Sequence, residues 1–205
     1  MLSLQTVFPD TLELLRTLSR QPLLSQMRLV GGTSLALQYG HRRSVDLDFF
    51  GKTTEDVDEL TEVMHLCAMD VVRGNCTKSI KTYLLDGIKV DIVNYKYAWI
   101  DNPLTEDGVI LSSPKDIAAM KVNAIMGRGT KKDFVDMYFL LQHYSFKDIM
   151  QFYLQKYTDG SEYRALLSMT YFDDADLQPM PFMFQPVEWE SLKREIKKNV
   201  EEYIK

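Results

Sequence analysis

Residues 29–50, LVGGTSLALQYGHRRSVDLDFF, contain a paired glycine followed by two closely spaced carboxylates, and this stretch decides the fold. The apolar run 27–30 ends at Gly31-Gly32, and apolar residues then recur with helical spacing up to residue 39, which predicts a strand, a tight turn and a helix. Residues 45–50 begin with strict alternation, so Asp46 and Asp48 share one face of a second strand. Along that strand the two carboxylates lie about 6.5 Å apart.

This arrangement favours a site for a metal and a phosphate. Asp46 and Asp48 repel each other, and a divalent cation between them removes the repulsion. Oxygen-only ligands suit Mg²⁺, which shares its coordination sphere with phosphates and water. Gly31 and Gly32 let the backbone approach a phosphate, towards which the N–H groups of the following helix point. Each signal also has an ordinary alternative, a simple turn for the glycines and a solvated strand face for the carboxylates.

The residues of this stretch resemble a known family. The order Gly-Gly-Thr-x-Leu-Ala-Leu, followed by Arg-x-Ser-x-Asp-Leu-Asp-Phe, is similar to the opening motif of the abortive-infection nucleotidyltransferase toxins, the AbiEii/AbiGii family. Arg42, Ser44, Asp46 and Asp48 fill that pattern. The family is a branch of the DNA polymerase beta nucleotidyltransferase superfamily, so the resemblance implies an α+β fold with a mixed sheet and flanking helices.

The composition indicates a folded protein that does not enter a membrane. The chain has 205 residues, of which 45% are hydrophobic, enough for a sizeable core. Its N-terminus has neither a basic region nor a long apolar run, and no stretch approaches 18 consecutive apolar residues, so we expect a soluble, cytoplasmic protein. Cys67 and Cys76 lack motif spacing and are predicted to be free thiols.

Charges are segregated along the chain, although the net charge is only −5. Residues 16–43 contain five arginines and no acid, residues 44–70 contain eight acids and one lysine, and residues 115–132 contain five basic residues and one acid. The plain interpretation is solvated faces. The alternative is a cleft in which metal-binding acids meet basic walls that hold a triphosphate and a polyanionic acceptor.

The rest of the first 111 residues predicts helices and strands of one α/β domain. We expect an amphipathic helix from Pro9 to Arg20 and another from about Thr53 to Ala68. Strands are expected at 69–72, 79–85, 88–94 and 109–111, and Asp86-Gly87 is a strong hairpin signal between the second and third of these.

The strand 88–94 carries one acid, Asp91, among apolar neighbours. An unpaired buried aspartate is costly, so a cation or hydrogen-bond donors should accompany it. The superfamily resemblance makes Asp91 the third metal carboxylate, on a strand beside that of Asp46 and Asp48. The alternative is that Asp91 pairs with an arginine or lies on an exposed edge.

From residue 112 onward the pattern is helical throughout, so we expect a catalytic domain at 1–111 and a helical subdomain at 112–205. Ser113-Pro114 predicts the start of a helix that ends at Gly127. Further helices are expected at 131–143, 145–157 and 186–205. Residues 170–185 are predicted to form a partner-binding loop or a lid.

A second stretch, residues 116–138, also resembles the family. The family pattern is a lysine, an arginine seven residues later, and then a basic residue followed by Asp-x-x-Asp. Lys121 and Arg128 fill the first two places, and Asp133 and Asp136 are the two aspartates. Lys132 stands where the family usually has arginine. Lys121 lies among apolar residues, which favours an anion at its ammonium, unless the side chain snorkels to the surface. We also expect methionine to be tolerated there. The two aspartates could hold Arg128 or Lys132, act as a base, or begin a helix.

The resemblance implies transfer of a nucleoside monophosphate from an NTP to an acceptor hydroxyl, with Mg²⁺ or Mn²⁺ held by Asp46, Asp48 and Asp91. It implies that Lys121 and Asp133 are catalytic together with these carboxylates. The implied phosphate-binding residues are Gly31, Gly32, Thr33, Ser34, Arg42, Ser44, Lys121 and Arg128. The implied acceptor is an RNA such as tRNA, and the implied genetic partner is a separately encoded antitoxin. Transfer to a small molecule, which the acidic net charge fits, and a non-catalytic nucleotide-binding module are the alternatives.

Overall fold

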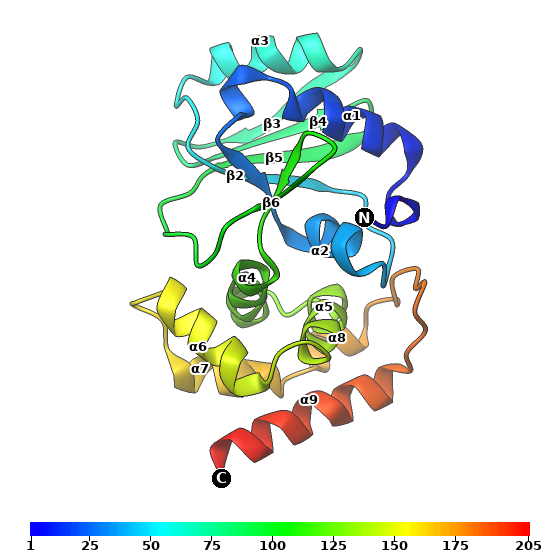
Figure 1. The fold of residues 1–205 in the computed structure, drawn as a ribbon, viewed down its shortest axis with the longest axis vertical. Helices are drawn as coiled ribbons and strands as arrows, with labels where there is room; N and C mark the ends of the chain where they lie inside the picture. The colour runs from blue at the N-terminus through cyan, green and yellow to red at the C-terminus, as the bar shows by residue number, and fades with distance from the viewer. The chain divides into compact units, whose positions relative to one another are not determined.

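The computed structural model describes all residues, 1–205, and divides into two compact units (Figure 1). The first unit consists of residues 1–96 and 103–112, and the second of residues 97–102 and 113–205. The first holds a mixed seven-stranded sheet with helices, and the second is helical, which confirms the predicted α+β class. That 1–111 and 112–205 are separate domains stays a prediction.

The sheet of the first unit has the strand order β3-β4-β5-β2-β1-β7-β6. Strand β2 runs parallel to β5 and β1 runs parallel to β7, whereas the other neighbours are antiparallel. The elements of this unit are η1 (Leu4–Thr6), α1 (Pro9–Ser19), η2 (Pro22–Leu24), β1 (Met27–Leu29), α2 (Gly31–Tyr39), β2 (Leu47–Gly51), α3 (Val57–Cys67), β3 (Val71–Cys76), β4 (Ile80–Leu85), β5 (Ile88–Asn94), β6 (Leu104–Glu106) and β7 (Val109–Leu111).

Alternation along the strands separates two faces of this sheet. One face is apolar and lies against α1 and α3, which Figure 1 shows on the same side of the sheet. Its buried residues come from every central strand: Met27, Leu29, Leu47, Phe49, Tyr83, Leu85, Val90, Ile92, Val109 and Leu111. Since successive side chains point to opposite faces, the residues between them, Asp48 and Asp91 included, project to the other face.

Several element boundaries differ from the sequence expectation. Strand β3 spans Val71–Cys76 instead of 69–72, and α9 begins at Trp189 instead of 186. Helix α2 begins at Gly31, so the glycine pair forms its first turn instead of a separate turn before it. Strand β2 begins at Leu47, which leaves Asp46 just ahead of it and Val45 47% exposed. Helix α3 begins at Val57, because the Asp56 carboxylate accepts hydrogen bonds from two backbone N–H groups of its first turn.

Two tight hairpins complete the sheet. The predicted turn at Asp86-Gly87 is confirmed, with φ of +48° and +81°. A second hairpin, between β6 and β7, was not predicted, and it turns at Asp107-Gly108 with φ of +54° and +76°. Both have the left-handed conformations of a type I′ turn, which joins two strands without splaying them.

The second unit contains six helices: α4 (Pro114–Gly127), α5 (Lys131–Leu141), α6 (Phe146–Lys156), α7 (Glu162–Met169), α8 (Asp173–Asp176) and α9 (Trp189–Ile204). Ser113 caps α4 as predicted, since its hydroxyl accepts the N–H of Asp116. The sequence did not predict α7 and α8. No helix of the chain is both long enough and apolar enough to cross a membrane.

Residues 97–102 are held in the second unit by a buried ion pair. The Lys156 ammonium donates to the Asp116 carboxylate at 2.7 Å and to the Ala98 carbonyl at 2.9 Å. Asp116 also accepts the backbone N–H groups of Ile100 and Asp101 at 2.9 and 3.2 Å. Because each buried charge has several partners, this pair fixes a segment that lies between β5 and β6 in the chain.

The segment 170–185, predicted to be a loop or a lid, contains α8, and its first part packs within the second unit. The Phe172 ring lies 4.7 Å from that of Phe134, measured between ring centroids. Lys193 donates to the Asp176 carboxylate at 2.9 Å, and the Gln178 side chain accepts the N–H of Lys131 at 3.0 Å. Residues 172–178 are therefore a fixed part of the helical packing.

Candidate active site

Gly31 brings the start of α2 against the carboxylate of Asp48. Its φ of +68° lies in the left-handed region, and a Cβ at this position would stand 2.6 Å from Asp48 Oδ2. Just before it, the N–H of Val30 donates to the Asp48 carbonyl at 2.9 Å. Only glycine combines this conformation with this approach, so the residue allows helix N–H groups to lie near the carboxylate.

Thr33 connects the same helix turn to the residues just ahead of β2. Its hydroxyl lies 2.8 Å from Ser44 Oγ and within hydrogen-bond distance of the Asp46 carbonyl. A hydroxyl has one proton to donate, so these two acceptors share it. Thr33 is itself buried. The Ser-x-Asp part of the Arg-x-Ser-x-Asp pattern is thus held against the first turn of α2 through the Ser44 hydroxyl and the Asp46 carbonyl.

Asp48 and Asp91 lie directly opposite each other on the parallel strands β2 and β5. Thr82, on β4, is the antiparallel partner of Asp91 and donates its hydroxyl to Asp91 Oδ1 at 2.7 Å. We call Thr82, Asp91 and Asp48 the carboxylate row. Strands β2 and β5 are neighbours in the sheet, which confirms the prediction that Asp91 lies on a strand beside that of Asp48. Because paired residues on neighbouring strands point to the same face, the two carboxylates lie on one face.

Lys89 lies beside the candidate site, and the sequence interpretation did not single it out. Its ammonium forms an ion pair with Asp91 Oδ2, two residues along the same strand face. Burial alone would lower the pKa of this ammonium, but the hydrogen bond and charge of Asp91, with the charges of Asp48 and Asp46, raise it above its ordinary value. Alternation could have found it, since residues i and i+2 of a strand share a face.

The donor atoms of these carboxylates are all oxygen, which suits a hard divalent cation. In the arrangement described, no group of three or more His, Cys, Asp or Glu side chains lies close enough to hold a metal ion. Asp48 and Asp91 are nevertheless side by side, and the cation that the structure places against Asp91 is Lys89. The assignment of Asp46, Asp48 and Asp91 as metal ligands therefore stays a prediction.

A second group of charged residues lies in the second unit. The Lys121 ammonium contacts Asp133 Oδ1 at 2.9 Å and Asp136 Oδ2 at 2.5 Å, and its side chain is 5% exposed while both aspartates are fully buried. The anion predicted at Lys121 is thus a pair of carboxylates from α5. Methionine would leave two buried negative charges without their ammonium, so this environment contradicts the expectation that it is tolerated.

Asp133 is bound by several donors at once. Arg128 donates Nε to Oδ2 at 2.9 Å and a terminal nitrogen to Oδ1 at 3.1 Å, and the Thr130 hydroxyl donates to Oδ2 at 2.5 Å. Burial alone would raise the pKa of Asp133, but the charges and hydrogen bonds of Lys121, Arg128 and Thr130 hold it far below its ordinary value. A carboxylate so held is a poor proton acceptor near neutral pH, which favours the alternative that Asp133 positions Arg128.

The remaining predicted residues lie deeper in the first unit. Ser34 is buried, and its hydroxyl accepts a hydrogen bond from Gln38 at 3.2 Å. Arg42 is 3% exposed and donates to the Arg43 carbonyl at 2.9 Å. The first unit thus brings together Gly31, Gly32, Thr33, Ser44, Asp46, Asp48 and Asp91, whereas Lys121, Arg128 and Asp133 form a group of their own in the second.

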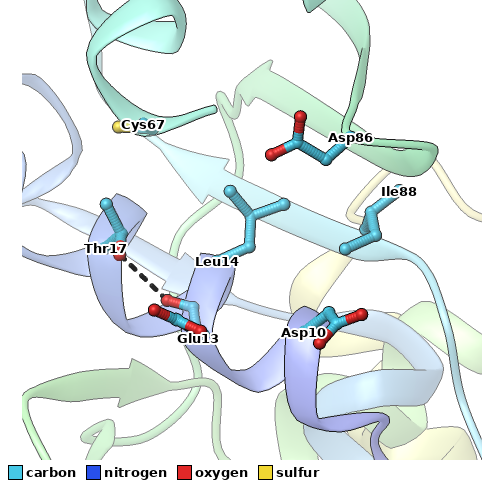
Figure 2. Close-up of a pocket in the computed structure, with 7 residues that line it drawn as sticks. All are labelled: Asp10, Glu13, Leu14, Thr17, Cys67, Asp86 and Ile88. Carbon is cyan, nitrogen blue, oxygen red and sulfur yellow. Dashed lines mark hydrogen bonds between the residues drawn. The ribbon is translucent and has the colours of Figure 1, made fainter. Parts of the chain in front are cut away.

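The first unit also has a hollow of about 370 Å³, which is distinct from the candidate site (Figure 2). It lies between α1, the end of α3 and the hairpin of β4 and β5, and its lining consists of Asp10, Glu13, Leu14, Thr17, Cys67, Asp86 and Ile88. Burial raises the pKa of the Cys67 thiol, which makes it a weak nucleophile near neutral pH. None of the predicted site residues lines this hollow.

Comparisons with known proteins find similar sequences and similar folds. The family model "Nucleotidyl transferase AbiEii toxin, Type IV TA system" matches residues 13–204. The uncharacterized protein aq_aa25 of Aquifex aeolicus (strain VF5) is 33% identical over 183 residues, covering 86% of this chain and 87% of that protein. MenT4, the nucleotidyltransferase toxin Rv2826c of Mycobacterium tuberculosis H37Rv, has a TM-score of 0.60 at 15% identity, with 95% and 86% of the two chains covered. JHP933 from Helicobacter pylori has a TM-score of 0.57 at 18% identity, with 94% and 88% covered. These two structures share the fold.

Proposed function

This chain belongs to the AbiEii family of nucleotidyl transferase toxins of type IV toxin–antitoxin systems, and from that premise we propose that it transfers a nucleoside monophosphate from an NTP to a hydroxyl of an RNA acceptor such as tRNA. The observation that carries this proposal is the register of Asp48 against Asp91 beside the glycine that opens α2. We further propose a dependence on Mg²⁺ or Mn²⁺ and a separately encoded antitoxin as genetic partner.

In the proposed reaction the acceptor hydroxyl oxygen forms a bond to the α-phosphorus and loses its proton to solvent. The bond between the α-phosphorus and the bridging oxygen breaks, and pyrophosphate leaves with that oxygen. Divalent ions would supply a lower pKa for the hydroxyl and charge neutralisation for the pyrophosphate. Asp46, Asp48 and Asp91 would hold these ions, and the backbone N–H groups of Gly31 and Gly32 would bind phosphate oxygens.

In the second unit we assign phosphate contact to Arg128, whose side chain is 59% exposed while it remains bound to Asp133. Lys121 and Asp133 are then positioning residues, because their contacts fix the guanidinium in one orientation. A guanidinium group that is already oriented loses less conformational entropy when it binds an anion. The direct phosphate contact that the sequence predicted for Lys121 stays a prediction.

The test is transfer of labelled nucleotide from each of the four NTPs to total cellular RNA, beside the variant Asp46→Asn. We expect label on RNA with at least one NTP and none with the variant. RNA binding should weaken with salt, with a log-log slope of about −0.7 for each phosphate neutralised in a single strand. Absence of RNA labelling with all four NTPs would overturn the RNA acceptor and leave transfer to a small molecule, which the net charge of −5 fits, or a non-catalytic module.

A further inference from the structure

The carboxylate row is followed on the same sheet face by a row of apolar residues. Strand register pairs Phe50 with Val93 and Val93 with Ile80, two residues beyond Asp48, Asp91 and Thr82 on their respective strands. We call Ile80, Val93 and Phe50 the apolar row. With the usual rise per residue, it lies about 6.6 Å from the carboxylate row along the strands.

These apolar side chains are not part of the core beneath α1 and α3. Ile80 is 46% exposed, and Phe50 and Val93 are half-buried, whereas the residues that alternate with them, such as Phe49 and Ile92, are buried on the other face. Tyr95, which follows β5 and is also half-buried, places its ring 5.1 Å from that of Phe50, at an interplanar angle of 52°. A partly exposed apolar surface with two rings beside a polar site favours a ligand with a flat apolar face.

We propose that the apolar row, with Tyr95, is a stacking platform for an unpaired base near the reacting end of a single-stranded RNA acceptor. Bases stack on aromatic side chains whatever their sequence, and stacking is how proteins hold unpaired RNA. The platform continues directly from the carboxylate row, so a base held on it leaves its ribose hydroxyl close to Asp91. This inference deepens the proposed function and depends on its RNA acceptor.

The position of the platform in the sheet favours the acceptor over the NTP. Gly31 follows β1, and its approach to Asp48 puts the expected phosphate contacts at the β1 side of β2. The platform extends from Phe50 on β2, the strand of Asp48, across β5 and β4, which lie on the side of β2 opposite to β1. Lys96, which is exposed just after Tyr95, supplies positive charge beside the platform, where the phosphates of an acceptor strand would pass.

The experiment measures binding of fluorescently labelled single-stranded RNA to the full chain in the absence of NTP, so that turnover is not required. A second probe, 2-aminopurine at the 3′-terminal position, reports stacking by quenching. The variants are Phe50→Ala and Ile80→Glu, since the exposure of Ile80 makes its replacement compatible with folding. Tyr163→Ala, which removes a 71% exposed ring of the second unit, is the matched control.

We expect each platform variant to weaken single-strand binding about tenfold or more and to abolish the quenching, with NTP affinity and duplex RNA binding unchanged. Tyr163→Ala should behave like the wild type. Lower NTP affinity with unchanged RNA binding would overturn the proposal by assigning the platform to the nucleotide base. Unchanged binding of both, or no single-strand binding by the wild type, would also overturn it. If the variants lose RNA binding and quenching while the wild type labels no RNA, the platform stands and the proposed transfer reaction fails.

Discussion

Asp48 and Asp91 come from strands that are distant in sequence, yet they are direct partners in the parallel pairing of β2 with β5. This register gives the first prediction. Asp48→Asn should abolish the metal dependence of NTP binding, because the amide cannot supply the negative charge that a hard divalent ion requires. Calorimetric titration with NTP, with and without Mg²⁺, measures this effect. Glu62→Gln, an exposed change on α3, should bind like the wild type. Equal metal-dependent affinity in the Asp48 variant would show that the ligands lie elsewhere.

Gly31 allows a prediction with a close control in the same unit. Gly31→Ala should destabilise the first unit by more than the 1–2 kcal/mol or so that a left-handed conformation costs, because its Cβ also meets the Asp48 carboxylate at 2.6 Å. Gly108→Ala has a similar φ, +76°, with nothing within 4 Å of the added atom. Scanning calorimetry of the two variants isolates the steric contribution. Equal losses of stability would mean that Asp48 simply moves aside.

Lys121→Met should lower the free energy of unfolding of the second unit by about 3–5 kcal/mol, the range expected when a buried ion pair loses one partner. Both tryptophans, Trp99 and Trp189, belong to this unit, so urea unfolding followed by tryptophan fluorescence reports on it alone. Lys132→Met, at an exposed neighbouring position, should be close to neutral. Adding Asp133→Asn and Asp136→Asn to the methionine variant should restore part of the loss. Unchanged stability of Lys121→Met would contradict the burial of this group.

The lowered pKa of Asp133 predicts how acid affects the second unit. The unfolded chain takes up a proton at Asp133 near the ordinary pKa of 3.8, whereas the folded unit resists protonation to a lower pH. The unfolded state therefore binds more protons below that value, and stability must fall as the pH drops through it. Tryptophan-monitored unfolding between pH 6 and 3 should show this loss. This fall of stability with pH should be shallower when Asp133→Asn is combined with Lys121→Met. Equal slopes of stability against pH in the wild type and this variant would rule out Asp133 as the source of the acid sensitivity.

Replacing Lys89 should strengthen metal binding, whereas replacing Asp48 should abolish it. Because its ammonium is bound to Asp91, a metal must displace it, and Lys89→Met should strengthen Mg²⁺ binding. The side chain is about half exposed, so the gain should be modest, up to about fivefold. The Mg²⁺ concentration at half-maximal thermal stabilisation measures it, with Lys78→Met as a control at another exposed lysine. Weaker Mg²⁺ binding in Lys89→Met would show instead that the lysine helps to hold the site together.

Local patterns predicted most of the elements, and their limits are visible in the two hairpins. Asp86-Gly87 was identified because alternating apolar strands flank it. Asp107-Gly108 carries the same signal but was missed, since β6 is only three residues long and none of its residues is buried. Helix α7 lacked a clear start signal, because Arg164 stands at its third position, where α6 has Asp148 in a capping box with Ser145.

The candidate site was predictable only where its residues are neighbours in the chain. Gly31, Asp46 and Asp48 follow from one short stretch, and alternation within β5 contains both Asp91 and Lys89. That Lys89 pairs with Asp91, and that Lys121 is neutralised by Asp133 and Asp136, depends on side-chain packing, which periodicity does not specify. Pairing energies between such groups are set by burial and geometry.

The buried pair of Lys156 and Asp116 has a consequence for how this protein can be divided. Because it holds residues 97–102 in the helical unit, the backbone passes from one unit to the other three times, after residues 96, 102 and 112. No single cut therefore separates the two units cleanly. A fragment that ends at residue 111 would keep this segment but lose both charged groups that bind it. Recombination at one crossover point would likewise produce incomplete units.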